Sequence, residues 1–500
     1  MTGVRIRLFL TCWLVYSLHF ATDVAREHYL VMSIVEDHSY ALDKYYGLHV
    51  DIFQNPPEAK VQGAHHGANP GISMLAAVPY FLTRPAVEWV VGRDLERRAG
   101  DDTAAVYRDD RPRRVEFYQR ARREGLDLRF GLVAAITLVL FMAPLTAGSA
   151  VMMFSALGAL GLAQRAALWL SLLYAFGTPV FFRAAYLNQN MAIGVFAFAA
   201  FLLIWNPRRM VRWSPRTRLV AAGLLGGLSF LSDYSGAVVA GLLGLYAWWR
   251  QADDRGVASG FRDSLWYGAG LLPGVLMLWQ YQWASFGNPF LPPQNWMAPV
   301  KWIDVGYQGV GGITPELLKM LLVDPRFGLF VAMPLALLAL PGPWLARRAR
   351  GLLPQRETLV CLGISAALVL FFSTVQYTRL QWVTGIRYLA PLFPFLFLAA
   401  VPLLLRLPRI VAWVVGLGSV LIGWSLAMVR NQGTVLDNVQ HFLLEGFQLP
   451  WLTVLGKLST QYAPWLQGRP SALPWLALTG VALALIWRVR NPWERIGGNP

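Results

Sequence analysis

The sequence predicts an all-α polytopic membrane protein with about fourteen transmembrane helices and a large first extracytoplasmic loop. Hydrophobic residues make up 56% of the 500 residues and charged residues only 14%, and the mean hydropathy of +0.43 exceeds the range of soluble proteins. The apolar residues also gather in long runs, and the basic residues gather between alternate runs. These three observations together indicate repeated membrane crossing.

The membrane spans are predicted from runs that approach the roughly 20 residues needed to cross a bilayer. They are Phe130–Leu145, Leu168–Phe182, Met191–Trp205, Leu219–Leu231, Ala237–Trp249, Leu265–Trp283, Phe327–Leu340, Leu359–Val375, Tyr388–Leu405, Ile410–Met428 and Leu473–Trp487. Three weaker runs, Leu8–Thr22, Gly71–Val91 and Ala150–Leu162, complete the set of about fourteen.

The net charge of +16 is distributed as a topology signal. Basic residues cluster near 5–7, 93–129, 208–218, 250–262, 347–356, 406–409 and 488–495, and the intervening loops are poor in Lys and Arg. This positive-inside pattern predicts an even number of spans with both termini in the cytoplasm. No aromatic-basic recognition module accompanies the charge, so we expect membrane lipids and no nucleic acid among the partners.

With this topology the chain divides into two regions. Residues 1–430 form the catalytic module, with a first outer loop at 23–70 and a cytoplasmic connector at 92–128, and residues 431–500 supply an outer segment, a last transmembrane helix and a cytoplasmic tail. Cys12 and Cys361 both lie in predicted spans, so no disulfide or thiolate metal site is expected.

The first outer loop is rich in carboxylates. The stretch TDVAREHYLVMSIVEDHSYALDKYYGLHVD, residues 22–51, contains six acidic residues against Arg26 and Lys44. Acidic residues contribute little to topology, so the positive-inside rule does not explain them. Asp23 lies at the predicted end of the first span, and ionisable groups at membrane depth are functional candidates. Such a carboxylate is suited to take a proton from an acceptor hydroxyl.

Several motifs along the chain resemble a known superfamily. The first-loop stretch is followed by GAHHGANPGISMLAAVPYFL, LLYAFGTPVFFRAAYLNQN, GLLGGLSFLSDYSGA, DPRFGLFVAMP and VTGIRYLAPLFPFL. Their order over positions 10–400 resembles the GT-C glycosyltransferases, and in particular the bacterial relatives of protein O-mannosyltransferases and of the lipid A aminoarabinose transferase. The resemblance implies a GT-C-like fold and an enzyme that moves a sugar from a polyprenyl phosphate to an acceptor hydroxyl at the outer membrane face.

The resemblance implies catalytic residues directly after the first span. Where many such enzymes have an acidic pair, this chain has Asp23-Val24, and an intact pair follows only at Glu36-Asp37. Asp23 is the favoured general base, with Glu36 or Asp37 assisting; the reverse assignment stays open.

The leaving phosphate requires cations. Arg387 and Arg326 each stand where a loop re-enters the membrane, and Lys44 lies in the acidic loop. The guanidinium fork matches phosphate oxygens. The alternative is that each arginine snorkels at the interface or pairs with a neighbouring acid, such as Asp324 beside Arg326.

Further polar residues are predicted to line the substrate cavity or, alternatively, to neutralise neighbours or cap helices. They are Arg26, Asp51, His65, His66, Asn69, Asn188, Asn190, Asp233, Tyr234 and Tyr388. The two histidines with Asp23 or Asp51 would also suit a divalent cation such as manganese, zinc or magnesium, although no metal or other cofactor is assigned.

Two other functions stay open at this point. One is a lipid or oligosaccharide transporter (flippase), and the other is an O-antigen polymerase or ligase, which also uses polyprenyl-linked sugar. The expected location is the bacterial inner (plasma) membrane, with the active site facing the periplasm or outside, and the acceptor is a lipid, a glycan or a protein.

Overall fold

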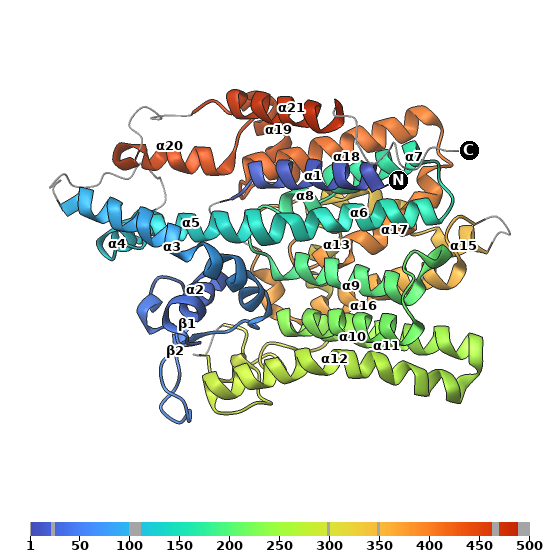
Figure 1. Cartoon of the computed structure of the whole chain (residues 1–500), viewed down its shortest axis with the longest axis horizontal. Helices are drawn as coiled ribbons and strands as arrows, with labels where there is room; N and C mark the ends of the chain where they lie inside the picture. Colours follow the sequence, from blue (N-terminus) through green and yellow to red (C-terminus); the bar gives the residue numbers. More distant parts are fainter. Residues whose placement is uncertain are drawn as a thin grey trace.

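A computed structural model describes residues 2–21, 26–99, 112–297, 301–347, 351–381, 383–462 and 470–488 (Figure 1). These residues are mostly helical, and one short antiparallel hairpin pairs β1 (Ile52–Gln54) with β2 (Ala64–His66). The fold is therefore all-α apart from a small element in the first outer loop.

The first part of the chain forms α1 (Thr2–Leu18), the first-loop elements and a long apolar helix. Its elements are α2 (Arg26–Met32), η1 (Ser33–Asp37), η2 (Asp43–Tyr45), α3 (Gly71–Ala99), α4 (Pro112–Arg123), α5 (Asp127–Thr137), η3 (Leu138–Met142), α6 (Ala143–Ala159), α7 (Gln164–Phe176), α8 (Val180–Arg183), α9 (Gln189–Trp205) and η4 (Pro207–Arg209).

The second part consists of further helices joined by links of different lengths. It comprises α10 (Pro215–Ser232), α11 (Ser235–Arg255), α12 (Val257–Phe286), η5 (Pro293–Asn295), α13 (Pro315–Val323), α14 (Leu329–Ala332), η6 (Pro334–Ala339), α15 (Gly342–Ala346), α16 (Gln355–Thr374), η7 (Gln376–Arg379), η8 (Ala390–Leu392), α17 (Phe393–Leu404), α18 (Arg409–Val429), α19 (Val435–Glu445), α20 (Pro450–Tyr462) and α21 (Leu473–Arg488).

Most of the long helices run side by side, so the molecule has two ends (Figure 1). We call the end that carries α2, β1 and β2, at the left of the view, the loop end. The N-terminal part of α1 lies at the opposite, terminal end, where Arg7 contacts Trp487 near the C-terminus of α21. At the loop end, the Trp451 indole donates to the Leu18 carbonyl at 2.9 Å.

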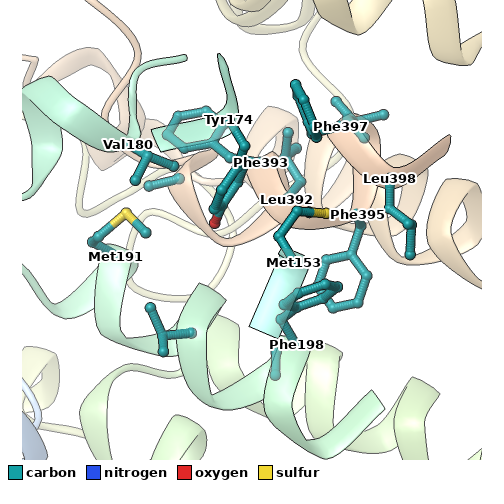
Figure 2. Close-up of a cluster of buried hydrophobic side chains, with 14 of the residues drawn as sticks. Met153, Tyr174, Val180, Met191, Phe198, Leu392, Phe393, Phe395, Phe397 and Leu398 are labelled. Carbon is teal, nitrogen blue, oxygen red and sulfur yellow. The ribbon is translucent and has the colours of Figure 1, made fainter. Parts of the chain in front are cut away.

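Apolar side chains from distant segments fill the space between these helices. Figure 2 shows a cluster in which residues of α6, α7 and α9 meet residues of η8 and α17. Tyr174 packs on Phe397 with ring centroids 5.4 Å apart, and Phe198 meets Phe395 edge-on at 5.9 Å. Since the hydrophobic residues of α17 are almost all buried, this helix is the centre of the bundle.

Helices α5, η3 and α6 are continuous over 33 residues, Asp127–Ala159, which is about 50 Å at 1.5 Å per residue. The η3 segment is a π-helical turn, and the carbonyl of Val139 within it accepts the indole N–H of Trp13 on α1 at 2.7 Å. Just before the turn, Thr137 Oγ1 lies 3.2 Å from His28 Nε2 on α2. The long helix thus connects the first loop to the bundle.

By length and composition, three helices within the described ranges are apolar enough to cross a membrane. They are Asp127–Ala159, Gln355–Thr374 and Arg409–Val429, with shorter apolar helices at Gln189–Trp205, Ala390–Leu404 and Leu473–Arg488. These helices indicate an integral membrane protein; the total of about fourteen crossings stays a prediction.

The contacts of the 92–128 connector contradict the expectation that it and the first loop lie on opposite sides of the membrane. Arg120 on α4 donates to the Tyr46 carbonyl of the first loop at 2.9 Å, and Arg129 at the start of α5 pairs with Glu36 at 2.8 Å. Groups in direct contact cannot stand on opposite sides of a hydrocarbon core about 30 Å thick. The connector therefore shares the side of the first loop, and α3 does not make the crossing expected at Gly71–Val91.

Candidate functional site

The candidate site begins with an arginine at the loop end of α8. A break at Gly177–Pro179 ends α7, and the single turn of α8 delivers Arg183, whose side chain is almost fully buried (1% exposed). Its guanidinium donates to the carbonyls of Gly385 and Ile386, both at 2.7 Å, and to the Tyr186 hydroxyl at 2.8 Å. Arg183 therefore holds the backbone that directly precedes Arg387.

Arg387 lies where this loop turns toward η8. Its backbone N–H donates to Gln381 Oε1 at 3.0 Å, and its guanidinium donates to the Leu380 carbonyl at 3.2 Å. Gly385 adopts a φ of +95°, and a Cβ there would lie 3.0 Å from the ring of Phe182. The loop thus depends on a glycine and on the arginine behind it to present Arg387.

Two further segments at the loop end, around Arg326 and Asn431, are hydrogen-bonded to the loop that carries Arg387. Thr384 donates its N–H to the Asn431 carbonyl at 3.0 Å, and the N–H of Gly385 donates to the Arg326 carbonyl at 2.7 Å. Arg430, directly before Asn431, places its guanidinium 5.3 Å from the centroid of the Tyr186 ring. Arginines from three segments therefore meet around one tyrosine.

The electrostatics of Tyr186 reflect this convergence. Burial opposes ionisation of its phenol, but the charges of Arg183, Arg387 and Arg430 outweigh burial and lower its pKa. Within the described ranges, no carboxylate forms an ion pair with Arg183 or Arg387. Buried charges normally have a partner, so this arrangement is suited to bind an anion.

The first loop brings carboxylates to the same region. Arg26, at the start of α2, pairs with Asp51 at 2.9 Å and with Glu27 at 3.3 Å. Burial opposes ionisation of both carboxylates, yet the pKa of each is lowered, by Arg26 first and also by Arg387. Ionised carboxylates therefore lie near the arginines, as a general base would require.

The short segments before α9 and α11 bring two of the predicted polar residues, Asn188 and Asp233, to the site. Asn188 caps α9 by accepting the Met191 N–H at 3.2 Å, and its amide donates to the Tyr186 hydroxyl at 3.2 Å. Asp233 accepts the side-chain amide of Gln189 at 2.8 Å, and burial raises its pKa. Asn188 thus caps a helix and also contacts Tyr186, and its part in a substrate cavity stays a prediction.

The other predicted cavity residues surround these links. Asn190 and Asn69 are buried, and the Asn69 amide donates to the Phe230 carbonyl at 3.0 Å. The Tyr234 hydroxyl accepts the Gln282 amide, and the Tyr388 hydroxyl donates to the Tyr377 carbonyl at 2.9 Å.

Within the described residues, the histidines of β2 do not join a third ligand in a metal centre. Neighbouring residues of a strand point to opposite faces, and His65 lies against Phe286 while His66 lies near Tyr281. Among the residues that the structure describes, no group of three His, Cys, Asp or Glu side chains is placed to hold a metal ion.

Other predicted site residues lie elsewhere. Glu36 accepts the Tyr80 hydroxyl at 2.6 Å and pairs with Arg129 and with Lys44, which lies 3.4 Å away. Asp37 and the side chain of Arg326 are exposed. We therefore do not include these residues in the site.

Asp23, the favoured base, lies outside the described residues. The described residues on either side of it are anchored at the loop end, since the Ala21 N–H donates to the Ala185 carbonyl at 2.7 Å and Arg26 belongs to the site.

Sequence reasoning missed Arg183, Tyr186, Gln189, Glu27 and Arg430. The signal for Arg183 was present, because a guanidinium directly after Phe181-Phe182 at the end of an apolar run must find partners. The first loop and the loops at 284–324 and 376–387 contact one another through their described residues. Gln294 donates to the Gly67 carbonyl at 3.1 Å, and the Gln376 N–H donates to the Gly309 carbonyl at 2.9 Å.

Comparisons with known proteins give one result. No protein-family model and no curated protein matches the chain. Among solved structures, the chain is similar to the crystal structure of ArnT from Cupriavidus metallidurans bound to undecaprenyl phosphate. The identity is 15% and the TM-score 0.48, over 97% of this chain and 72% of that chain. The function proposed below is argued from the residues of the site.

Proposed function

We propose that this protein is a GT-C-type membrane glycosyltransferase that moves a sugar from a polyprenyl phosphate to an acceptor hydroxyl at the loop end. The observation that carries the proposal is the pair Arg183 and Arg387, which lie at the ends of apolar helices without a carboxylate partner within the described ranges. A lipid-linked phosphate would supply the missing negative charge from the membrane.

The chemistry follows from these groups. The acceptor oxygen attacks the anomeric carbon of the sugar, the bond from that carbon to the phosphate oxygen breaks, and the phosphate leaves with the electron pair. A carboxylate takes the acceptor's proton. Arg387 and Arg430 are placed to stabilise the charge that develops on the phosphate, and Arg183 positions the loop that carries Arg387.

Asp23 stays the proposed base, by its position between the first span and Arg26. Glu27 and Asp51 are the described alternatives, because both are ionised and close to Arg26. The ion pairs with Arg26 make Glu27 and Asp51 weaker bases than an unpaired carboxylate would be.

The test is transfer by purified protein from a panel of undecaprenyl phosphate sugars, with three isosteric variants: Asp23→Asn, Glu27→Gln and Asp51→Asn. Loss of the base should reduce turnover by roughly 10²–10⁴-fold while binding of undecaprenyl phosphate persists. Glu36→Gln is the matched control, since that carboxylate is bonded to Tyr80 and Arg129 instead. Near-normal turnover in all three variants would refute the mechanism, and transport without transfer would favour a flippase.

A further inference from the structure

His66 is a buried side chain whose orientation is fixed by its own loop. It is fully buried (0% exposed), and its Nδ1 lies 3.0 Å from the backbone nitrogen of Ala68. A backbone N–H can only donate, so Nδ1 must accept. A neutral imidazole that accepts at Nδ1 carries its proton on Nε2.

The Nε2–H of His66 has no hydrogen-bond partner within the described part of the chain. Buried donors are normally satisfied, and each exception requires an explanation. Because Nδ1 faces the histidine's own loop, Nε2 on the far side of the ring points away from that loop.

The turn directly after His66 is contacted by the loop that contains η5. Gln294 donates to the Gly67 carbonyl at 3.1 Å, and a Cβ on Gly67 would lie 2.6 Å from the sulfur of Met297, near the end of a flexible side chain. These contacts position the backbone of the turn, and the bond from the Ala68 N–H orients the imidazole.

The charged groups that face His66 are those of the candidate site. Arg26, Glu27, Asp51 and His65 act on the imidazole, and burial, the largest cause, lowers the pKa of His66 to about 3. The ring is therefore neutral at physiological pH and acts as a hydrogen-bond donor with a fixed tautomer.

We propose that the Nε2–H of His66 donates a hydrogen bond to an oxygen of the lipid phosphate bound at the arginine site. This inference rests on the proposed function. The imidazole would contribute a directed donor to a phosphate otherwise held by guanidinium groups, and it would do so without adding charge.

Two substitutions distinguish the roles of the two ring nitrogens of His66. His66→Asn keeps an acceptor oxygen at the position of Nδ1, and so keeps the bond from Ala68, but removes the donor that reaches outward. His66→Gln keeps an amide donor at the distance of Nε2. The probe is undecaprenyl phosphate without sugar, and its dissociation constant is measured on full-length protein in nanodiscs. The His66→Asn variant loses a hydrogen bond to a charged group, so its dissociation constant for undecaprenyl phosphate should rise roughly 10–100-fold. His66→Gln should stay within about threefold of the unmodified protein.

The melting temperature of the ligand-free protein supplies the control, since a structural role alone would lower it in His66→Asn. Equal affinity in both variants and the unmodified protein would overturn the inference and leave the proposed function standing. Equal weakening in both variants would also overturn it, because it would indicate a packing effect. A normal affinity with reduced turnover in His66→Asn would assign the donor to a sugar or acceptor oxygen, contrary to the proposal. An unmodified protein that does not bind undecaprenyl phosphate would refute the proposed function itself.

Discussion

The guanidinium of Arg183 lies 2.7 Å from the carbonyl oxygen of Gly385, although 202 residues separate the two positions in the chain. The same guanidinium also binds the Ile386 carbonyl. A buried arginine that donates hydrogen bonds to backbone carbonyls holds a loop in place. The loop held here carries Arg387. The loop end is thus organised around one side chain that is not expected to touch the substrate.

Arg183→Met should lower both stability and lipid phosphate binding. Each carbonyl that loses its donor while buried costs about 1–3 kcal/mol, and the loop before Arg387 would lose its support. Arg183→Lys should restore the charge but not the binding, because an ammonium cannot reproduce the planar fork. Arg326→Ala is the matched control, since its side chain is exposed and only its backbone contacts Gly385. Thermal unfolding and undecaprenyl phosphate binding measure both effects, and an Arg183→Lys protein with full affinity would contradict the positioning role.

Arg387→Ala should weaken the affinity for undecaprenyl phosphate roughly tenfold or more, because the phosphate loses a charge-assisted donor. Folding should be nearly unchanged, since the guanidinium's hydrogen bond within the described protein is to the Leu380 carbonyl. Arg379→Ala on the same loop is the control, because that side chain is exposed and bonds to Gln376. Titration of the lipid against all three proteins separates the outcomes, and equal affinities would exclude Arg387 from the phosphate site.

Arg26→Gln should destabilise the protein more at neutral pH than at acid pH. Burial opposes ionisation of Asp51, but Arg26 at 2.9 Å outweighs it and lowers the pKa. A carboxyl whose folded pKa is lowered contributes stability above its unfolded pKa, which is about 3.9, and this stability is lost as the pH falls through the folded value. The difference in melting temperature between the unmodified protein and Arg26→Gln should therefore be large at pH 7 and shrink toward pH 3. Arg84→Gln, in an exposed pair with Glu88, should show little difference at either pH. A pH-independent difference for Arg26→Gln would contradict the assignment.

Lys60→Cys and Arg123→Cys should react with a membrane-impermeant maleimide from the same side. Both positions are exposed, and the connector that contains Arg123 contacts the first loop through Arg120 and Tyr46. Arg255→Cys, in the turn between α11 and α12, should react from the opposite side. The native Cys12 and Cys361 are buried and give no background. If Arg123→Cys and Arg255→Cys were labelled from the same side, the connector would lie on the side opposite to the first loop, as the sequence predicted.

The sequence was sufficient for the class of the fold because apolar runs report directly on the bilayer. It also indicated Arg387, Tyr388 and Asp233, polar residues near the ends of such runs, and Asp51 of the acidic first loop, as candidate site residues. The connector was misplaced because the positive-inside rule weighs Lys and Arg in short loops, whereas this long segment packs on the first loop through Arg129 and Glu36.

The apolar run before Arg183 marks this arginine as a candidate, but the sequence does not show which groups it binds. Its partners lie at Gly385 and Ile386, and no local pattern reveals a bond across 202 residues. Glu36 was overvalued because an adjacent acidic pair resembles a catalytic motif, while its actual partners, Tyr80 and Arg129, are set by packing.

The π-helical turn at Leu138–Met142 makes the register of one long helix depend on a single additional residue. A π-helical turn holds one residue more than an α-helical turn over nearly the same rotation, so the helix faces on its two sides stay aligned. Thr137 can therefore lie beside His28 while α6 packs against α1. Removing a residue outside this turn would rotate one side of the helix by about 100° relative to the other, so evolution can exchange residue types along this helix more easily than it can change the helix's length.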